Sequence, residues 1–146
     1  MTESTGRRAS LGFRRLLWLG SVAAAAAVLA TAAWLEPDPL GHGTHTQLGL
    51  PPCGFLWLTE LPCPACGLTT AFAHGVRGSL GQAALANPVG LALFLSVCLL
   101  IPFGLFAAVR GWSLDTLIER FSIHRWALLL ASSAGLVWLA RIAAAL

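Results

Sequence analysis

The stretch from Asn87 to Val109 reads Asn-Pro-Val-Gly-Leu-Ala-Leu-Phe-Leu-Ser-Val-Cys-Leu-Leu-Ile-Pro-Phe-Gly-Leu-Phe-Ala-Ala-Val, and it contains no charged residue. A helix needs ~20 apolar residues to cross the hydrocarbon core of a bilayer, which is about 30 Å thick. Asn87 suits the N-cap of such a helix, and Pro88 suits its first position. Residues 88–109 are therefore predicted to form a transmembrane helix.

Two further apolar runs flank this stretch. Residues 16–35 carry tryptophans near both ends, as side chains at the membrane interface do, and residues 126–146 are interrupted only by Arg141. An arginine near a helix end can extend its charged group to the interface. These patterns predict an all-α integral membrane protein with about three transmembrane helices.

The composition of the chain agrees with this class of protein. Of its 146 residues, 57% are hydrophobic and 10% are charged, whereas soluble domains carry roughly a quarter charged residues. The formal net charge is +3, and the arginines are scattered at the ends of apolar runs. This distribution indicates the lipid bilayer as a partner and excludes a nucleic-acid-binding surface.

The positions of the arginines predict the orientation. Seven of them lie in a basic N-terminus, residues 1–15, and in a loop, residues 110–125, whereas Arg77 and Arg141 lie on the other side of the spans. Because positive charge is enriched on the cytoplasmic side, we expect a multi-pass protein of the inner (cytoplasmic) membrane with its N-terminus inside. Residues 36–87 then form an extracytoplasmic loop.

The first apolar run has a second interpretation. Ala30-Thr31-Ala32 follows a basic N-terminus and an apolar core, which is the pattern of a signal peptide with a small-residue cleavage site. The apolar stretch is longer than the usual ~7–15 residues of a signal peptide. Residues 36–87 lie outside the cytoplasm in either case.

The loop of residues 36–87 is predicted to contain short interfacial helices. Leu68, Phe72 and Val76 recur at a spacing of four residues, as on one face of a helix. Ser79 and Gln82 have the spacing of a capping box that begins another short helix.

The same loop holds Cys63-Pro64-Ala65-Cys66, two thiols separated by two residues. If Cys63 lies near a helix N-cap and Pro64 at the first position, the helix amides favour a Cys63 thiolate. A structural disulfide, a metal site and a redox pair all use this spacing.

Three more residues extend the candidate site, namely Cys53, His42 and His45. Thiolates and imidazoles together make tetrahedral zinc sites, and they also suit copper. Three cysteines cannot all pair within one chain, so the odd one needs a metal, a partner or a role as a free thiol. The candidate metal ligands are therefore Cys63, Cys66, Cys53, His42 and His45.

The run Leu61-Pro-Cys-Pro-Ala-Cys-Gly-Leu-Thr69, followed by Gly78 and by Asn87-Pro88, resembles a bacterial membrane-protein family, domain of unknown function 2752. The family motif is CPxCGxTR, then a short helix, a glycine-containing turn and an Asn-Pro pair that opens the next span. The resemblance covers roughly Gly41 to Val109. It implies the same topology and no settled activity. Besides the cysteines, it marks a structural motif made of Pro64, Gly67, Thr69, Asn87 and Pro88.

The chain departs from the family motif at one position, where Thr70 stands in place of the arginine. Any role of that arginine is therefore not carried over to this chain. The string His42-Gly-Thr-His45-Thr-Gln-Leu-Gly-Leu-Pro-Pro-Cys53 resembles an elaboration within a sub-family.

Three functions fit these observations. The first is a non-catalytic module that binds zinc or copper, or an accessory subunit that works with another membrane protein or with a second copy of this chain. The second is membrane thiol–disulfide exchange, with Cys63 attacking, Cys66 resolving and Cys53 as a relay. The third is a scaffold held by a Cys63–Cys66 disulfide. No phosphate-binding loop, HExxH or GxSxG motif indicates another enzyme.

Overall fold

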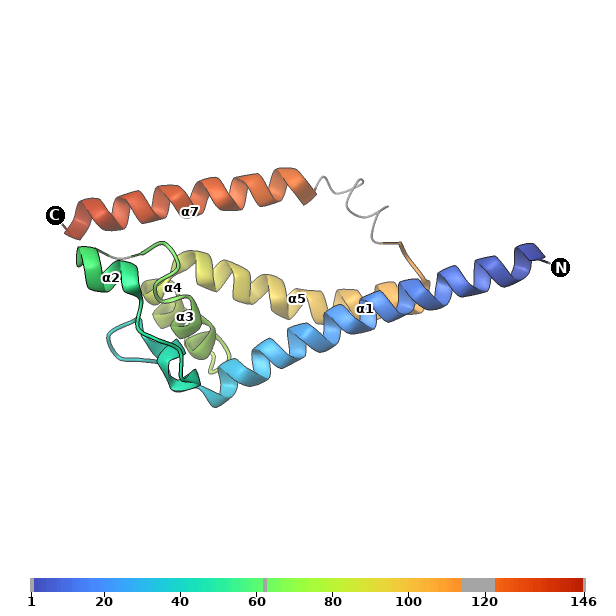
Figure 1. Cartoon of the computed structure of the whole chain (residues 1–146), viewed down its shortest axis with the longest axis horizontal. Coiled ribbons are helices and arrows are strands. Elements are labelled where there is room, and N and C mark those ends of the chain that lie inside the picture. Colours follow the sequence, from blue (N-terminus) through green and yellow to red (C-terminus); the bar gives the residue numbers. More distant parts are fainter. Residues whose placement is uncertain (1, 62, 114–122, 146) are drawn as a thin grey trace.

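The computed structural model describes residues 2–61, 63–113 and 123–145, and every regular element among them is a helix. In chain order the elements are α1 (Thr2–Trp34), the 3-10 helix η1 (Thr44–Leu48), α2 (Gly54–Thr59), α3 (Leu68–Gly75), α4 (Leu80–Ala86), α5 (Pro88–Arg110) and α7 (Ile123–Ala145). The all-α fold class predicted from the sequence is confirmed (Figure 1).

Two of these helices are long and apolar enough to cross a membrane. They are Leu11–Trp34, of 24 residues within α1, and Pro88–Arg110, of 23 residues. Both expose large apolar side chains along their length, such as Leu16 at 66% and Leu99 at 69%. A surface of this kind suits lipid, because water would not solvate it.

Of the third predicted span, residues 126–146, the described residues 126–145 fall within α7. The described apolar part of this helix, Ala127–Ala140, is shorter than the two others, so a third span remains a prediction. The predicted loop of residues 110–125 lies largely outside the described residues.

Helices α1 and α5 lie antiparallel and form a hairpin. They pack closely at the end that is far from the short helices. Gly104 of α5 has no side chain, and Val22 of α1 occupies the space that a Cβ atom would need, with Trp18 in contact beside it. Trp18 is 3% exposed and packs on Ala107 and Ala108, and its Nε1 donates to the carbonyl oxygen of Trp112 at 2.9 Å. Small residues permit such close helix contacts in membranes.

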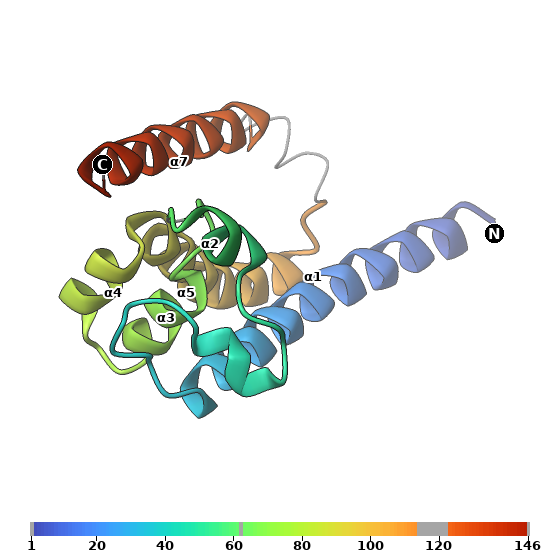
Figure 2. The ribbon, with the colours of Figure 1, turned by 60° about the vertical axis from the view of Figure 1, so that its left-hand side comes forward.

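The opposite end of the hairpin is closed by α3. Ala32 of α1, Phe72 of α3 and Phe94 of α5 form one buried cluster, and the two phenyl rings meet edge to face with centroids 5.7 Å apart. Figure 2 shows α2, α3 and α4 gathered at this end, where α1 ends and α5 begins.

Arg77, which follows α3, caps the end of α1. Its Nη2 donates to the carbonyl oxygen of Ala33 at 3.2 Å, and its Nη1 donates to those of Ala32 and Ala73 at 3.4 and 2.7 Å. The last carbonyls of a helix have no partners within the helix, and they carry its partial negative charge. The guanidinium therefore satisfies two backbone groups that lie next to the predicted membrane boundary.

The short helices predicted around Phe72 and after Ser79 are present as α3 and α4. They pack on each other through Ala71, Ala83 and Ala86. Ser79 is the N-cap residue of α4, but its side chain forms no capping hydrogen bond, so the predicted capping box is wrong in this respect.

Candidate metal centre

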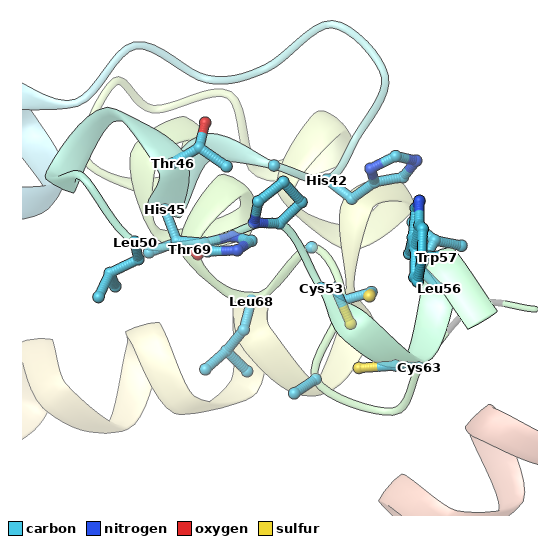
Figure 3. A pocket seen from close by; sticks show the side chains of 15 residues that line it. His42, His45, Thr46, Leu50, Cys53, Leu56, Trp57, Cys63, Leu68 and Thr69 are labelled. Atoms are coloured by element: carbon cyan, nitrogen blue, oxygen red, sulfur yellow. The ribbon is translucent and has the colours of Figure 1, made fainter. Parts of the chain in front are cut away.

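Three cysteines from two separate segments converge beside α3. Cys53 immediately precedes α2, whereas Cys63 and Cys66 lie in the turn that precedes α3. The Sγ atoms of all three lie within 4.8 Å of one another. Cys66 is buried, and Cys53 and Cys63 are half-buried. None of the three is in a disulfide, so the Cys63–Cys66 disulfide, one of the three alternatives for this spacing, is not formed. Figure 3 shows the side chains of Cys53 and Cys63 close to each other.

The Cys63–Cys66 segment is a turn and not the start of a helix. The backbone N–H of Cys66 donates to the carbonyl oxygen of Cys63 at 3.0 Å, and that of Leu68 donates to Ala65 at 3.1 Å. Helix α3 begins only at Leu68, with Gly67 as its N-cap residue. The prediction that Cys63 lies at the N-cap and Pro64 at the first helical position is therefore wrong.

Gly67 is the physical reason for this difference. Its φ of 86° lies in the left-handed region, which interrupts a right-handed helix at this point. A Cβ atom at Gly67 would collide with the carbonyl oxygens of Ala86 and Gly41. Glycine is thus required both by the backbone conformation and by the close approach of two other segments.

Asn87 fixes this turn to the start of α5. Its Oδ1 accepts a hydrogen bond from the N–H of Gly90 at 2.9 Å, as predicted for an N-cap residue. Its Nδ2 donates to the carbonyl oxygens of Cys66 at 3.1 Å and Pro64 at 3.3 Å. The side chain is 1% exposed. One buried amide therefore joins the cysteine turn to a predicted transmembrane helix.

The three thiols have different environments. The backbone N–H of Leu56, in the first turn of α2, is the main cause that lowers the pKa of Cys53 below its ordinary value of 9.0, and the thiols of Cys66 and Cys63 lower it further. Burial raises the pKa of Cys66 to about 12, and the neighbouring Cys63 adds to this increase. The cysteine that lies at a helix start is thus Cys53, the N-cap residue of α2, and not, as predicted, Cys63.

The two predicted histidine ligands lie on the wall of the same pocket, outside the group of three sulfurs. The pocket has a volume of about 600 Å³, and His42, His45 and the three cysteines all line it (Figure 3). The Nε2 of His45 lies 3.2 Å from the carbonyl oxygen of Pro51. A carbonyl oxygen only accepts, so in a neutral ring Nε2 carries the proton and Nδ1 keeps a lone pair.

The other residues of the predicted structural motif surround the turn. Pro64 supplies a carbonyl acceptor to Asn87, Thr69 lines the pocket from the first turn of α3, and Pro88 is the first residue of α5.

Thr70, at the position of the family arginine, is completely buried. Its hydroxyl shares a hydrogen bond of 2.8 Å with that of Thr44 in η1, and Thr44 Oγ1 also accepts from the N–H of Asp38 at 3.0 Å. Sequence reasoning did not find this pair.

The spacing of the sulfurs fits a single soft metal ion. Thiolates bind Zn²⁺ at about 2.3 Å, so in a tetrahedral site their sulfurs lie about 3.8 Å apart. Sulfurs that already lie within 4.8 Å of one another need only small side-chain movements to reach this geometry. The donors that the structure brings together therefore fit zinc or copper.

These features define a class: an all-helical protein with two apolar helices of membrane-spanning length and three thiols gathered at one end of them. Residues 53–101 match the family model described as "Protein of unknown function (DUF2752)". The resemblance predicted from the CPxCGxT motif is thereby confirmed, over a shorter segment than residues 41–109. The matched segment contains the three clustered cysteines and Asn87, and it leaves His42 and His45 outside. No curated protein and no solved structure matches the chain.

Proposed function

We propose that this chain is a membrane protein that binds one Zn²⁺ or Cu⁺ ion through Cys53, Cys63 and Cys66 on the extracytoplasmic side. It would act as a non-catalytic accessory module. The observation that carries the proposal is the convergence of three Sγ atoms, from two segments, to within 4.8 Å of one another. Thiolates are the ligands that select zinc and Cu⁺ over harder ions.

A metal ion at the cluster would compete with the proton of the buried Cys66 thiol. The pKa of Cys66, raised to about 12, keeps this thiol protonated at neutral pH when no cation is near. A bound metal replaces that proton, because cysteine ligates as the thiolate. A disulfide, by contrast, would use two of the three thiols and leave the third without a partner.

The side of the cluster that faces the pocket offers a further ligand. His42 lies between Gly41 and Gly43, which both have positive φ, and His45 keeps Nδ1 available. Either imidazole would complete a tetrahedral zinc site, whereas Cu⁺ is satisfied by three thiolates. Of the five ligands predicted from the sequence, this proposal keeps the three cysteines as the core and one of the two histidines as the fourth donor.

The test is the metal content of the protein purified in detergent under reducing conditions. We expect one zinc or copper ion per chain in the wild type, and loss of the ion in Cys53→Ser, Cys63→Ser and Cys66→Ser. Cys98→Ser is the matched control, because Cys98 lies in the middle of α5 among apolar side chains and its replacement should leave the metal in place. Wild-type protein with three reactive thiols and no metal after reconstitution would refute the proposal.

Thiol–disulfide exchange is the second candidate, and the lowered pKa of Cys53 favours it. The Cys53 thiolate would attack a disulfide in a partner protein, forming a mixed disulfide and releasing one partner thiolate. Attack by Cys63 on the Cys53 sulfur would then release the second partner thiolate. The chain is left with a Cys53–Cys63 disulfide, and the partner has gained two electrons. A reduction potential below about −300 mV for this pair would identify a structural bond and contradict exchange.

A further inference from the structure

A second hollow lies beside the cysteine pocket, on the surface of α1. Its volume is about 330 Å³. The residues that line it come from the last turns of α1 and the first turns of α3, and they are Ala27, Val28, Thr31, Ala32, Leu35, Leu68, Thr69 and Phe72. The hydroxyl of Thr31 already donates to the carbonyl oxygen of Ala27 at 2.9 Å. The hollow, called the α1 groove below, is therefore lined by apolar groups almost throughout.

The position of the α1 groove along α1 indicates what occupies it. Residues 27–35 extend about 12 Å along the helix at 1.5 Å per residue, and they lie at the end of the candidate span Leu11–Trp34. This length falls within one leaflet of a hydrocarbon core of about 30 Å. Val28 is 47% exposed. In a membrane, the hydrocarbon chain of a lipid-like molecule fills such a surface.

The α1 groove adjoins the cysteine pocket along one turn of helix. Leu68 and Thr69 line both hollows, and they follow Cys66 and Gly67 directly in the chain. A molecule whose apolar chain lies in the α1 groove thus needs to pass only the first turn of α3 to bring its other end to the three sulfurs. Figure 3 shows Leu68 and Thr69 on the wall of the pocket that holds Cys53 and Cys63.

The lining of the cysteine pocket defines the end group that it accepts. Leu50, Leu56 and Trp57 supply apolar surface, and His42 and His45 supply polar groups. None of the described residues that line either hollow is an aspartate, glutamate or arginine. A strongly charged headgroup would find no opposite charge there, whereas a small uncharged polar group would find imidazoles and thiols.

We propose that the cysteine pocket takes its ligand from the bilayer: an amphiphile whose apolar chain lies in the α1 groove and whose small uncharged polar head reaches Cys53, Cys63 and Cys66. The inference goes beyond the proposed function, because it adds an organic ligand at the site proposed for the metal ion. The ligand enters from the side, along α1 and past Leu68 and Thr69.

Two thiol reagents with the same reactive group test this route. One is a maleimide with a dodecyl chain, which partitions into the bilayer, and the other is a sulfonated maleimide, which stays in water. Both react with reduced, metal-free protein in phosphatidylcholine vesicles, in a Cys98→Ser background that removes the thiol within α5. The rates of modification of Cys53 and Cys63 are measured by peptide mass spectrometry.

A side chain that fills the α1 groove should slow the reaction with the dodecyl maleimide and leave the rate with the sulfonated maleimide unchanged. Ala27→Trp and Thr31→Trp each place an indole in the groove from an exposed position of α1, so we expect a several-fold slower reaction with the dodecyl maleimide and an unchanged rate with the sulfonated one. Leu99→Trp is the matched control, because Leu99 is exposed on α5 and lines neither hollow. It should change neither rate.

The route is overturned if both groove variants react with the dodecyl maleimide as fast as the wild type does, or if both reagents slow to the same extent. Metal content is measured separately on the same variants. If the groove variants keep their metal and the rates of modification by the two maleimides change equally or not at all, the route alone has failed. If no variant binds metal and the rates separate, the proposed metal function has failed and the route stands.

Discussion

At the scale of single residues, the three clustered thiols differ in their readiness to lose a proton. Cys53 faces the first N–H groups of α2, and Cys66 is 7% exposed and held through its carbonyl by Asn87. Only the thiolate is nucleophilic. The cluster therefore has one reactive sulfur and one inert sulfur, although all three lie within the same few ångströms.

This difference predicts the order of alkylation in the reduced, metal-free protein. Because its pKa is lowered, Cys53 is a thiolate at a lower pH than an ordinary cysteine with a pKa of 9.0, so limiting iodoacetamide near neutral pH should modify it first. Cys66, with its pKa raised to about 12, should react last and only in strongly alkaline solution. Peptide mass spectrometry measures the order, and equal rates at Cys53 and Cys66 would contradict it.

Gly67 offers a second prediction, with an internal control. Alanine in the left-handed region costs about 1–2 kcal/mol. Gly67→Ala and Gly49→Ala share that cost, because their φ values are 86° and 75°. Only at Gly67 does the new Cβ also meet the carbonyl oxygens of Ala86 and Gly41, whereas at Gly49 it meets open space. We expect Gly67→Ala to lower the melting temperature in detergent clearly more than Gly49→Ala does, and to release the metal. Equal shifts for the two variants would mean that the close approach contributes nothing.

At the scale of elements, the Asn87 side chain caps α5 and also binds the cysteine turn. A substitution can remove the second of these roles and keep the first. Asn87→Asp keeps an oxygen to accept from Gly90 N, but it loses both donations and places a carboxylate against the carbonyls of Pro64 and Cys66. We expect the helix content to stay unchanged by circular dichroism while the metal affinity falls and Cys66 becomes more reactive. Asn87→Ala removes both tasks and should also lower the melting temperature. A variant Asn87→Asp with wild-type metal affinity would show that the turn does not depend on Asn87.

The sequence predicts the helices of this protein better than it predicts the cysteine turn. Apolar runs and four-residue spacing are local signals, and they identified α3, α4 and α5 with small errors at their ends. They also identified the apolar part of α1, although this helix begins at Thr2 and not at residue 16. The start of α3 was predicted too early because the conformation of Gly67 depends on carbonyls of Gly41 and Ala86, which are distant in the chain. No local pattern reports such contacts.

Two further roles were hidden for the same reason. Arg77 was interpreted only as a charge that reports topology, whereas its guanidinium binds carbonyls of α1 more than 40 positions away. Thr70 depends on Thr44, 26 positions away. The candidate ligands, by contrast, were predicted from residue type, the CxxC spacing and the number of cysteines in the loop, and the structure brings three of the five together.

At the scale of the whole molecule, α7 returns toward the end of the hairpin that carries the cysteines. The rings of Phe55 in α2 and Trp138 in α7 meet edge to face with centroids 6.3 Å apart, and the C-terminal end of α7 lies beside α2 (Figure 1). Burial of Trp18, Ala32 and Leu35 also supports α1 as a retained span, since a cleaved signal peptide would leave α3 and α5 uncovered. Three spans with the N-terminus inside remain the prediction from the apolar runs and from the positions of the arginines.

This topology predicts the side on which the C-terminus lies. With three spans and the N-terminus inside, alkaline phosphatase fused after residue 146 should be active, and green fluorescent protein fused there should be dark. A fusion after Ser113, which follows α5, is the control and should show the reverse. A bright fluorescent fusion at the C-terminus would mean that α7 does not cross the membrane.

The contact of Trp18 and Val22 with Gly104 has a mechanical consequence. Gly104 and Asn87 belong to the same helix and lie about 26 Å apart at 1.5 Å per residue. Helix α5 therefore contacts α1 at Gly104, and the Asn87 amide at its start binds the carbonyl oxygen of Cys66. A tilt of α5 about this contact would move Asn87, and with it the carbonyl of Cys66, relative to Cys53.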